Sequence, residues 1–209
     1  RTILYKNPCM LMLSSPQGMR GISGFEYRLT DQIADMFKKY CDDVKIDSLG
    51  SVIAVKRSNK PNAPKLMIEA HCDEIGLIVT SITDEGYLTF ANVGGVDERT
   101  LPSTEVTVHG KEDLWGVIGI KPNYLLEQGK TAKLKELAVD TGLSAEKVKE
   151  LAAVGDSITL AQSVGRLGKK QFSGKSLDDR ASVAAIMRVM KNIKDLDIDI
   201  DVYAVAAVQ

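Results

Sequence analysis

The chain has 209 residues, of which 27 are basic, 28 are acidic and 44% are hydrophobic. This composition is typical of a globular protein with one large or two small domains, and its near-neutral charge argues against a nucleic-acid partner. The three cysteines lie far apart without a C-x-x-C pair, which argues against a disulfide framework and a structural zinc finger.

No apolar run approaches the roughly 20 residues that a membrane span requires. We therefore expect a soluble, cytoplasmic protein without a membrane partner. The chain begins at Arg1 without a methionine and stops at Gln209 within an apolar, strand-like run. Because domains seldom end in mid-strand, we expect sequence to be missing at both ends, above all at the C-terminus.

The first third of the chain predicts one helix and two strands. A loop rich in Gly, Ser and Pro leads into a helix over 26–41. Turns at 49–50 and 59–64 bound strands over 51–57 and 65–70, which together predict a β-hairpin. The apolar face of the helix comprises Leu29, Ile33, Met36, Phe37 and Tyr40.

The remainder of the chain is first β-rich and then α/β again. A helical stretch is expected over 130–151, with Ser144 as an N-cap, and a second helix begins at Leu177. The sequence 197–208 reads as a final strand. The short β segments before the first of these helices cover 75–83, 86–95, 104–110 and 114–122.

This order of elements predicts one domain inserted into another. The first part of an α/β domain is expected over 1–73, a β-rich insert over 74–166, and the second part of the α/β domain over 167–209. No internal repeat is evident.

The stretch "KLMIEAHCDEIGLIV", residues 65–79, places four reactive side chains in a row. Neighbours on a strand point to opposite faces, so His71 and Asp73 should share one side, and Cys72 and Glu74 the other. Two interpretations stay open for His71 and Asp73: a structural pair, or a metal ligand with the carboxylate that orients it. The end of a strand in an open α/β sheet is where such folds bind ligands.

The stretch "SLDDR" is a second candidate, because Asp178 and Asp179 stand at the start of a predicted helix. Such aspartates either cap the helix or carry a metal-bridging carboxylate on a rigid base. A nucleophilic Cys72 is the rival hypothesis, but its neighbour His71 should point away from it. His109, at a turn, is expected to be exposed.

Seven short motifs stand in order along the chain: "SGFE", "DSLGSVIA", "IEAHCDEIGLIVTSI", "NVGGVD", "GVIGIKP", "VGD" and "SLDDRAS". Taken together, in this order and at these intervals, they resemble the metal-dependent peptidases of the glutamyl aminopeptidase and cellulase-M-like family, the tetrahedral aminopeptidases. The resemblance runs from about Leu11 to Gln209.

The resemblance implies an α/β fold in which a phosphorylase/hydrolase-like catalytic domain carries an inserted, β-rich, PDZ-like dimerisation domain. It implies peptide substrates, two divalent metal ions per subunit (zinc, cobalt or manganese), and a homo-oligomer, a dodecamer built from dimers. His71 would then ligate one metal, Asp73 would orient His71, and Asp178 would bridge both metals, often with a cis peptide to Asp179.

In this family two metals activate a water, and a glutamate transfers its proton to the leaving amine. That glutamate and a second, metal-ligating one directly follow a strand that ends like "AVQ", where this chain stops. With His71 and Asp178 alone, we expect the 209-residue chain to bind metal weakly and to hydrolyse nothing. Two alternatives stay open: a catalytically inactive assembly or binding subunit of the same fold, and a glycoside hydrolase working through paired carboxylates. Residue specificity and the role of Glu74 stay unassigned.

Overall fold

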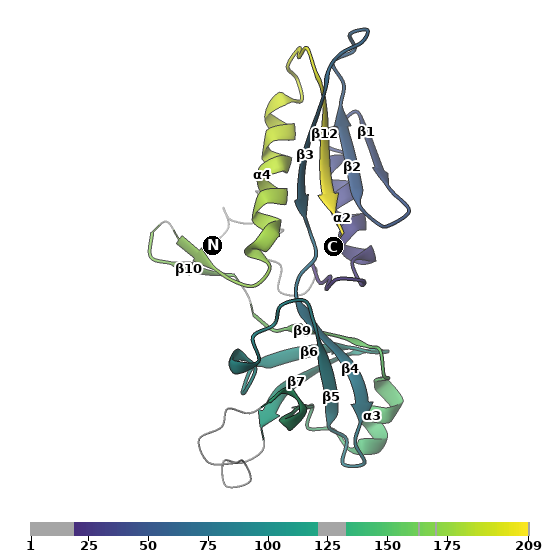
Figure 1. Cartoon of the computed structure of the whole chain (residues 1–209), viewed down its shortest axis with the longest axis vertical. Helices are drawn as coiled ribbons and strands as arrows, with labels where there is room; N and C mark the ends of the chain where they lie inside the picture. The colour runs from purple at the N-terminus through teal and green to yellow at the C-terminus, as the bar shows by residue number, and fades with distance from the viewer. Residues whose placement is uncertain (1–18, 121–132, 163, 170, 209) are drawn as a thin grey trace. The chain divides into compact units, whose positions relative to one another are not determined.

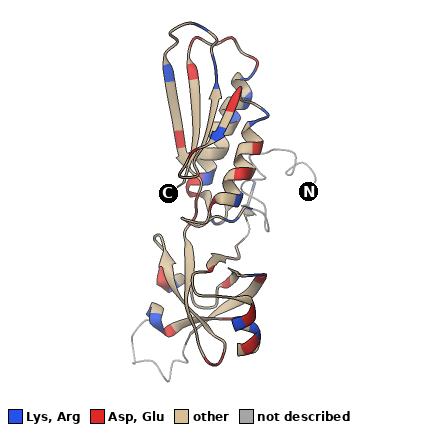
Figure 2. Cartoon of the chain, turned by 90° about the vertical axis from the view of Figure 1, so that its right-hand side faces the viewer, with Lys and Arg blue, Asp and Glu red and all other residues tan. Residues whose placement is uncertain are grey.

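The computed structural model describes residues 19–120, 133–162, 164–169 and 171–208, and the chain divides into two compact units (Figure 1). Unit 1 comprises Arg1–Glu74 and Ser163–Gln209, and unit 2 comprises Ile75–Gln162. Acidic and basic residues alternate along the ribbon of both units (Figure 2). In the described part of the chain, every helix is too short or too polar to cross a membrane. Cys9 and the predicted helix start at Lys130 lie outside the described residues.

Unit 1 contains a four-stranded sheet with the strand order β1-β2-β12-β3. Strand β12 runs antiparallel to β2 and parallel to β3. The predicted hairpin of β2 and β3 is therefore wrong, because β12 lies between them. Strand β12 carries no charge after Asp201, which suits a central position, whereas β3 bears exposed charged side chains that suit an edge. The strands are β1 (Asp43–Ile46), β2 (Val52–Lys56), β3 (Lys65–His71) and β12 (Asp201–Ala207).

Two helices, α2 (Tyr27–Phe37) and α4 (Leu177–Ile193), pack on the same face of this sheet (Figure 2). Helix α2 ends four residues before the predicted end, because the chain turns at Lys38 to enter β1. A small hairpin of β10 (Gly165–Leu167) and β11 (Gln171–Ser173) precedes α4 and is exposed. The core between helices and sheet consists largely of Leu29, Ile33, Phe37, Val52, Ala54, Ala70, Cys72, Val183, Met187, Met190, Ala204 and Ala206.

Unit 2 is a closed barrel with the strand order β4-β5-β8-β7-β6-β9, and its described residues also include the short α-helix α3. Leu137–Asp140, expected to be helical, instead forms β8, because its alternating buried and exposed side chains fit between β5 and β7. The predicted N-cap is confirmed: the Ser144 hydroxyl accepts from the Lys147 amide at the start of α3. The elements are β4 (Gly76–Ile82), β5 (Leu88–Val93), η2 (Glu98–Thr100), β6 (Glu105–His109), β7 (Asp113–Ile120), η4 (Leu134–Glu136), β8 (Leu137–Asp140), α3 (Ala145–Leu151) and β9 (Ser157–Leu160).

Candidate functional site

His71 is the last residue of β3, at the carboxyl end of the two parallel strands of unit 1. The next residue, Cys72, turns into the core and is fully buried, so the alternation expected from the sequence holds at this point. The imidazole of His71 keeps 39% of its surface exposed. At the end of this strand, Cys72 therefore belongs to the core, whereas His71 is accessible to a ligand.

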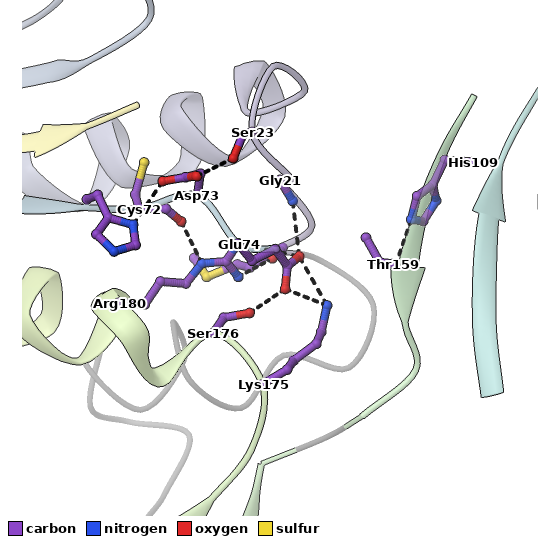
Figure 3. Close-up of polar contacts among 12 residues, drawn as sticks. Gly21, Ser23, Cys72, Asp73, Glu74, His109, Thr159, Lys175, Ser176 and Arg180 are labelled. Carbon is purple, nitrogen blue, oxygen red and sulfur yellow. Dashed lines mark hydrogen bonds and ion pairs between the residues drawn. The ribbon is translucent and has the colours of Figure 1, made fainter. Parts of the chain in front are cut away.

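The two ring nitrogens of His71 contact two different carboxylates. Nδ1 lies 2.9 Å from Oδ1 of Asp73, and Nε2 lies 3.2 Å from Oδ1 of Asp178. The second oxygen of Asp73 accepts a hydrogen bond of 2.5 Å from the Ser23 hydroxyl (Figure 3). Asp73 is therefore held from both sides, and its carboxylate fixes the orientation of the imidazole. The structure brings together all three residues that the sequence proposed.

Asp178 stands in an irregular first turn of α4. Ser176 adopts a left-handed conformation with φ of 61°, and the φ and ψ angles of Asp178 and Asp179 are not helical. The peptide bond between the two aspartates is cis, as the family resemblance implied. Within the described residues, neither carboxylate accepts a hydrogen bond from a helix amide, so their contacts do not support the capping interpretation. Asp178 instead presents an almost fully exposed carboxylate to Nε2 of His71.

This pair is suited to a divalent metal. Imidazole and carboxylate are the ligands that zinc, cobalt and manganese accept. Two ligand atoms on one tetrahedral zinc ion lie roughly 3.3 Å apart, given metal–ligand bonds of about 2.0–2.1 Å. The separation of 3.2 Å between Nε2 and Oδ1 matches that value. Among the described residues, however, no group of three or more His, Cys, Asp or Glu side chains is placed to hold a metal. The pair thus fits part of a metal site.

The charge state of His71 depends on the same two carboxylates. Burial of the ring lowers the pKa of His71, but hydrogen bonds to Asp73 and then Asp178 outweigh this effect and raise the pKa above its usual value. A protonated imidazole cannot ligate a metal, so protons and metal ions compete for Nε2.

Glu74 and Arg180 form a buried centre next to this site that sequence reasoning left unassigned. Their relative exposures are only 4% and 2%. Burial raises the pKa of Glu74, but the charges of Arg180 and then Lys175 outweigh it and lower the pKa below its usual value. One sequence signal did exist: Arg180 lies three residues before Val183 on the apolar face of α4, where a cation requires a buried partner.

The structure changes the interpretation of two other residues, Cys72 and His109. Burial raises the pKa of Cys72 to about 12, which removes the thiolate that a nucleophile requires. The prediction that His109 is exposed is wrong, because only 12% of its side chain is accessible. Its ring lies between Asp113 and Thr159, on the neighbouring strands of the barrel. His109 is therefore a hydrogen-bonded part of unit 2.

Comparison with known proteins decides the family. A sequence model described as M42 glutamyl aminopeptidase matches residues 50–209, which is most of the chain. The chain belongs to the M42 glutamyl aminopeptidase family. The resemblance inferred from the seven motifs is thereby confirmed, and M42 peptidases are metal-dependent in general.

Relatives and solved structures agree with the M42 assignment. The chain is 35% identical over 197 residues to a lysyl aminopeptidase of Pyrococcus furiosus, covering 90% of this chain and 56% of that protein. An aminopeptidase of Desulfurococcus kamchatkensis superposes with a TM-score of 0.88 at 32% identity, covering 98% of this chain and 57% of the other. The Pyrococcus horikoshii TET1 peptidase, which can assemble into a tetrahedron or a large octahedral shell, gives 0.83 at 32% identity, covering 96% and 60%. The mixed α/β fold is therefore that of TET aminopeptidases, and the chain spans little more than half the length of these M42 relatives.

Proposed function

We propose that this protein is a metal-dependent aminopeptidase that removes N-terminal residues from peptides. The observation that carries the proposal is the arrangement of His71, held by Asp73 through one nitrogen and facing Asp178 with the other. Membership of the M42 family supports a peptide substrate. Among the described residues, this is the arrangement that combines an oriented imidazole with an accessible carboxylate.

Each of the three residues has a distinct role in the proposal. Asp73 accepts the Nδ1 proton of His71, so the Nε2 lone pair faces the carboxylate of Asp178. In this proposal His71 would hold one divalent ion, and Asp178 would be shared between two. Such ions, when bound, would supply Lewis-acid activation of the scissile carbonyl and of a water molecule, and a binding point for the free amine of the substrate.

The donor types favour zinc, cobalt or manganese for both positions. One histidine and one carboxylate cannot hold two ions in a defined geometry. We therefore expect the 209-residue chain alone to bind catalytic metal weakly and to show no turnover, and we propose that the full-length protein completes the ligand set.

Unit 2 is proposed to serve assembly. Its closed barrel is compatible with a PDZ-like dimerisation domain inserted into a phosphorylase/hydrolase-like catalytic domain. A homo-oligomer is supported by the TET1 peptidase, a structural neighbour that can assemble into a tetrahedron or a large octahedral shell. We propose a dodecamer built from dimers as the form of this assembly. We propose the cytoplasm as its location.

Hydrolysis of aminoacyl p-nitroanilides by the full-length protein tests this function. We expect turnover that a chelator abolishes and that added Co²⁺ or Zn²⁺ restores. A protein that binds the metal yet releases no amine would instead be an inactive assembly subunit. Chelator-resistant cleavage of a β-glucan, without amine release, would indicate a glycoside hydrolase and contradict the proposal.

A further inference from the structure

The two residues proposed as metal ligands come from segments that are far apart in sequence, and their direct contact cannot fix them. The carboxylate of Asp178 is 97% exposed, so water competes for its contact with His71. Helical hydrogen bonding does not fix Asp178 either, because its φ and ψ angles and those of Asp179 are not helical. Another set of contacts must hold the start of α4 beside β3.

The carboxylate of Glu74, three residues after His71, supplies one set of these contacts (Figure 3). It accepts from Nζ of Lys175 at 2.8 Å and 3.1 Å, and from the hydroxyl of Ser176. It also accepts from the amide of Gly21 at 3.3 Å. One buried carboxylate therefore joins the end of β3 to the segment directly before Asp178 and to the loop before α2.

Arg180, two residues after Asp178, supplies the other set. Its Nη2 lies 3.5 Å from Oε1 of Glu74. Its Nε donates to the carbonyl of Cys72 at 2.8 Å, and its Nη1 donates to the carbonyl of Met19 at 2.5 Å. Contacts on both sides of Asp178 in the sequence therefore fix its position. Before it, Lys175 and Ser176 contact Glu74. After it, Arg180 contacts Cys72 and Glu74.

We propose that Glu74 and Arg180 are positioning residues, whose buried ion pair holds the segment 175–180, and with it Asp178, beside His71. The proposal rests on the proposed roles of His71 and Asp178 as metal ligands. Neither Glu74 nor Arg180 touches the ring of His71 in the contacts described, so both act through the main chain. Loss of either should weaken metal binding by misplacing Asp178.

Hydrogen exchange of the full-length protein tests the positioning directly and needs no metal. In Glu74→Gln, amides of 175–180 should exchange roughly tenfold faster, while those of 183–193 in the same helix stay unchanged. General destabilisation would accelerate both segments equally. Unchanged exchange in 175–180 would overturn the proposal.

Co²⁺ affinity, measured by equilibrium dialysis, tests the consequence for the metal. Glu74→Gln should weaken binding by about 10- to 100-fold, the range for residues that orient ligands. The double variant Glu74→Gln/Arg180→Met should bind Co²⁺ about as weakly as the weaker of the two single variants, because both changes break the same ion pair. Fully additive losses of affinity in the double variant would contradict the proposal.

Two exposed residues provide matched controls. Glu85→Gln removes a carboxylate from a turn of unit 2, and Arg188→Gln removes a cation from the exposed face of α4. Neither should change exchange or Co²⁺ affinity. If the unaltered protein binds no Co²⁺, the proposed function fails, whereas equal binding by it and by Glu74→Gln would refute only the positioning.

Discussion

Replacement of Arg180 by methionine should destabilise unit 1 selectively. The change keeps the apolar stem but removes both hydrogen bonds to the carbonyls of Cys72 and Met19 and the charge next to Glu74. Each carbonyl left unpaired in the core costs about 1–3 kcal/mol. Breaking a buried ion pair costs about 3–5 kcal/mol when the remaining charge has no other partner. Because Lys175 and Ser176 still contact Glu74, most of that cost is avoided and the two carbonyls dominate, so we expect the free energy of unfolding to fall by about 3 kcal/mol.

Urea denaturation with two probes measures this loss. Far-UV circular dichroism follows mainly α2 and α4 of unit 1, whereas the fluorescence of Trp115, the only tryptophan, follows unit 2. Only the dichroism transition should move. Since the pKa of Glu74 is lowered in the folded protein, its ion pair stabilises above the unfolded pKa of about 4.3 and is lost as the pH falls through the folded value. The difference in the free energy of unfolding between the unaltered protein and Arg180→Met should therefore become smaller at acidic pH. A loss below about 1 kcal/mol at neutral pH, comparable to that of Arg188→Gln, would refute this reasoning.

Three further outcomes are expected. Asp73→Asn should weaken Co²⁺ binding by about 10- to 100-fold in equilibrium dialysis, because the amide no longer fixes the charge and tautomer of His71; unchanged affinity would contradict that role. With Cys9 and Cys41 replaced by serine, Cys72 should resist an aromatic disulfide reagent at about pH 8 until urea is added, because burial raises its pKa to about 12. Fast labelling of the native protein would revive the nucleophile hypothesis. Gly110→Ala should lower the stability of unit 2 by roughly 1–3 kcal/mol in Trp115 fluorescence, since a Cβ there would lie 2.2 Å from the carbonyl oxygen of Leu151; an unshifted transition would show that the turn adjusts.

Local patterns in the sequence predicted most individual elements of the fold. The apolar spacing of α4 and the succession of short β segments in unit 2 are short-range signals, and both are confirmed. The pairing of strands is a long-range property, so the position of β12 between β2 and β3 was missed. A similar limit applies to Leu137–Asp140, whose strand is fixed by its neighbours in the barrel.

Only part of the candidate site was predictable from the sequence, because the site also depends on long-range contacts. His71 and Asp73 are two residues apart on a strand, so alternation alone places them on one side. The contact of His71 with Asp178 joins residues 107 positions apart, and only the family resemblance anticipated it. The pairing of Glu74 with Arg180 was missed because the partner of a buried carboxylate becomes evident only after the chain has folded.

The most direct test of the metal site is anomalous diffraction from crystals of the full-length protein grown with Co²⁺. We predict a peak at bonding distance, about 2.0–2.2 Å, from Nε2 of His71 and a carboxylate oxygen of Asp178. The peak should disappear in His71→Ala. Cobalt bound elsewhere, with His71 and Asp178 still contacting only each other, would contradict the account.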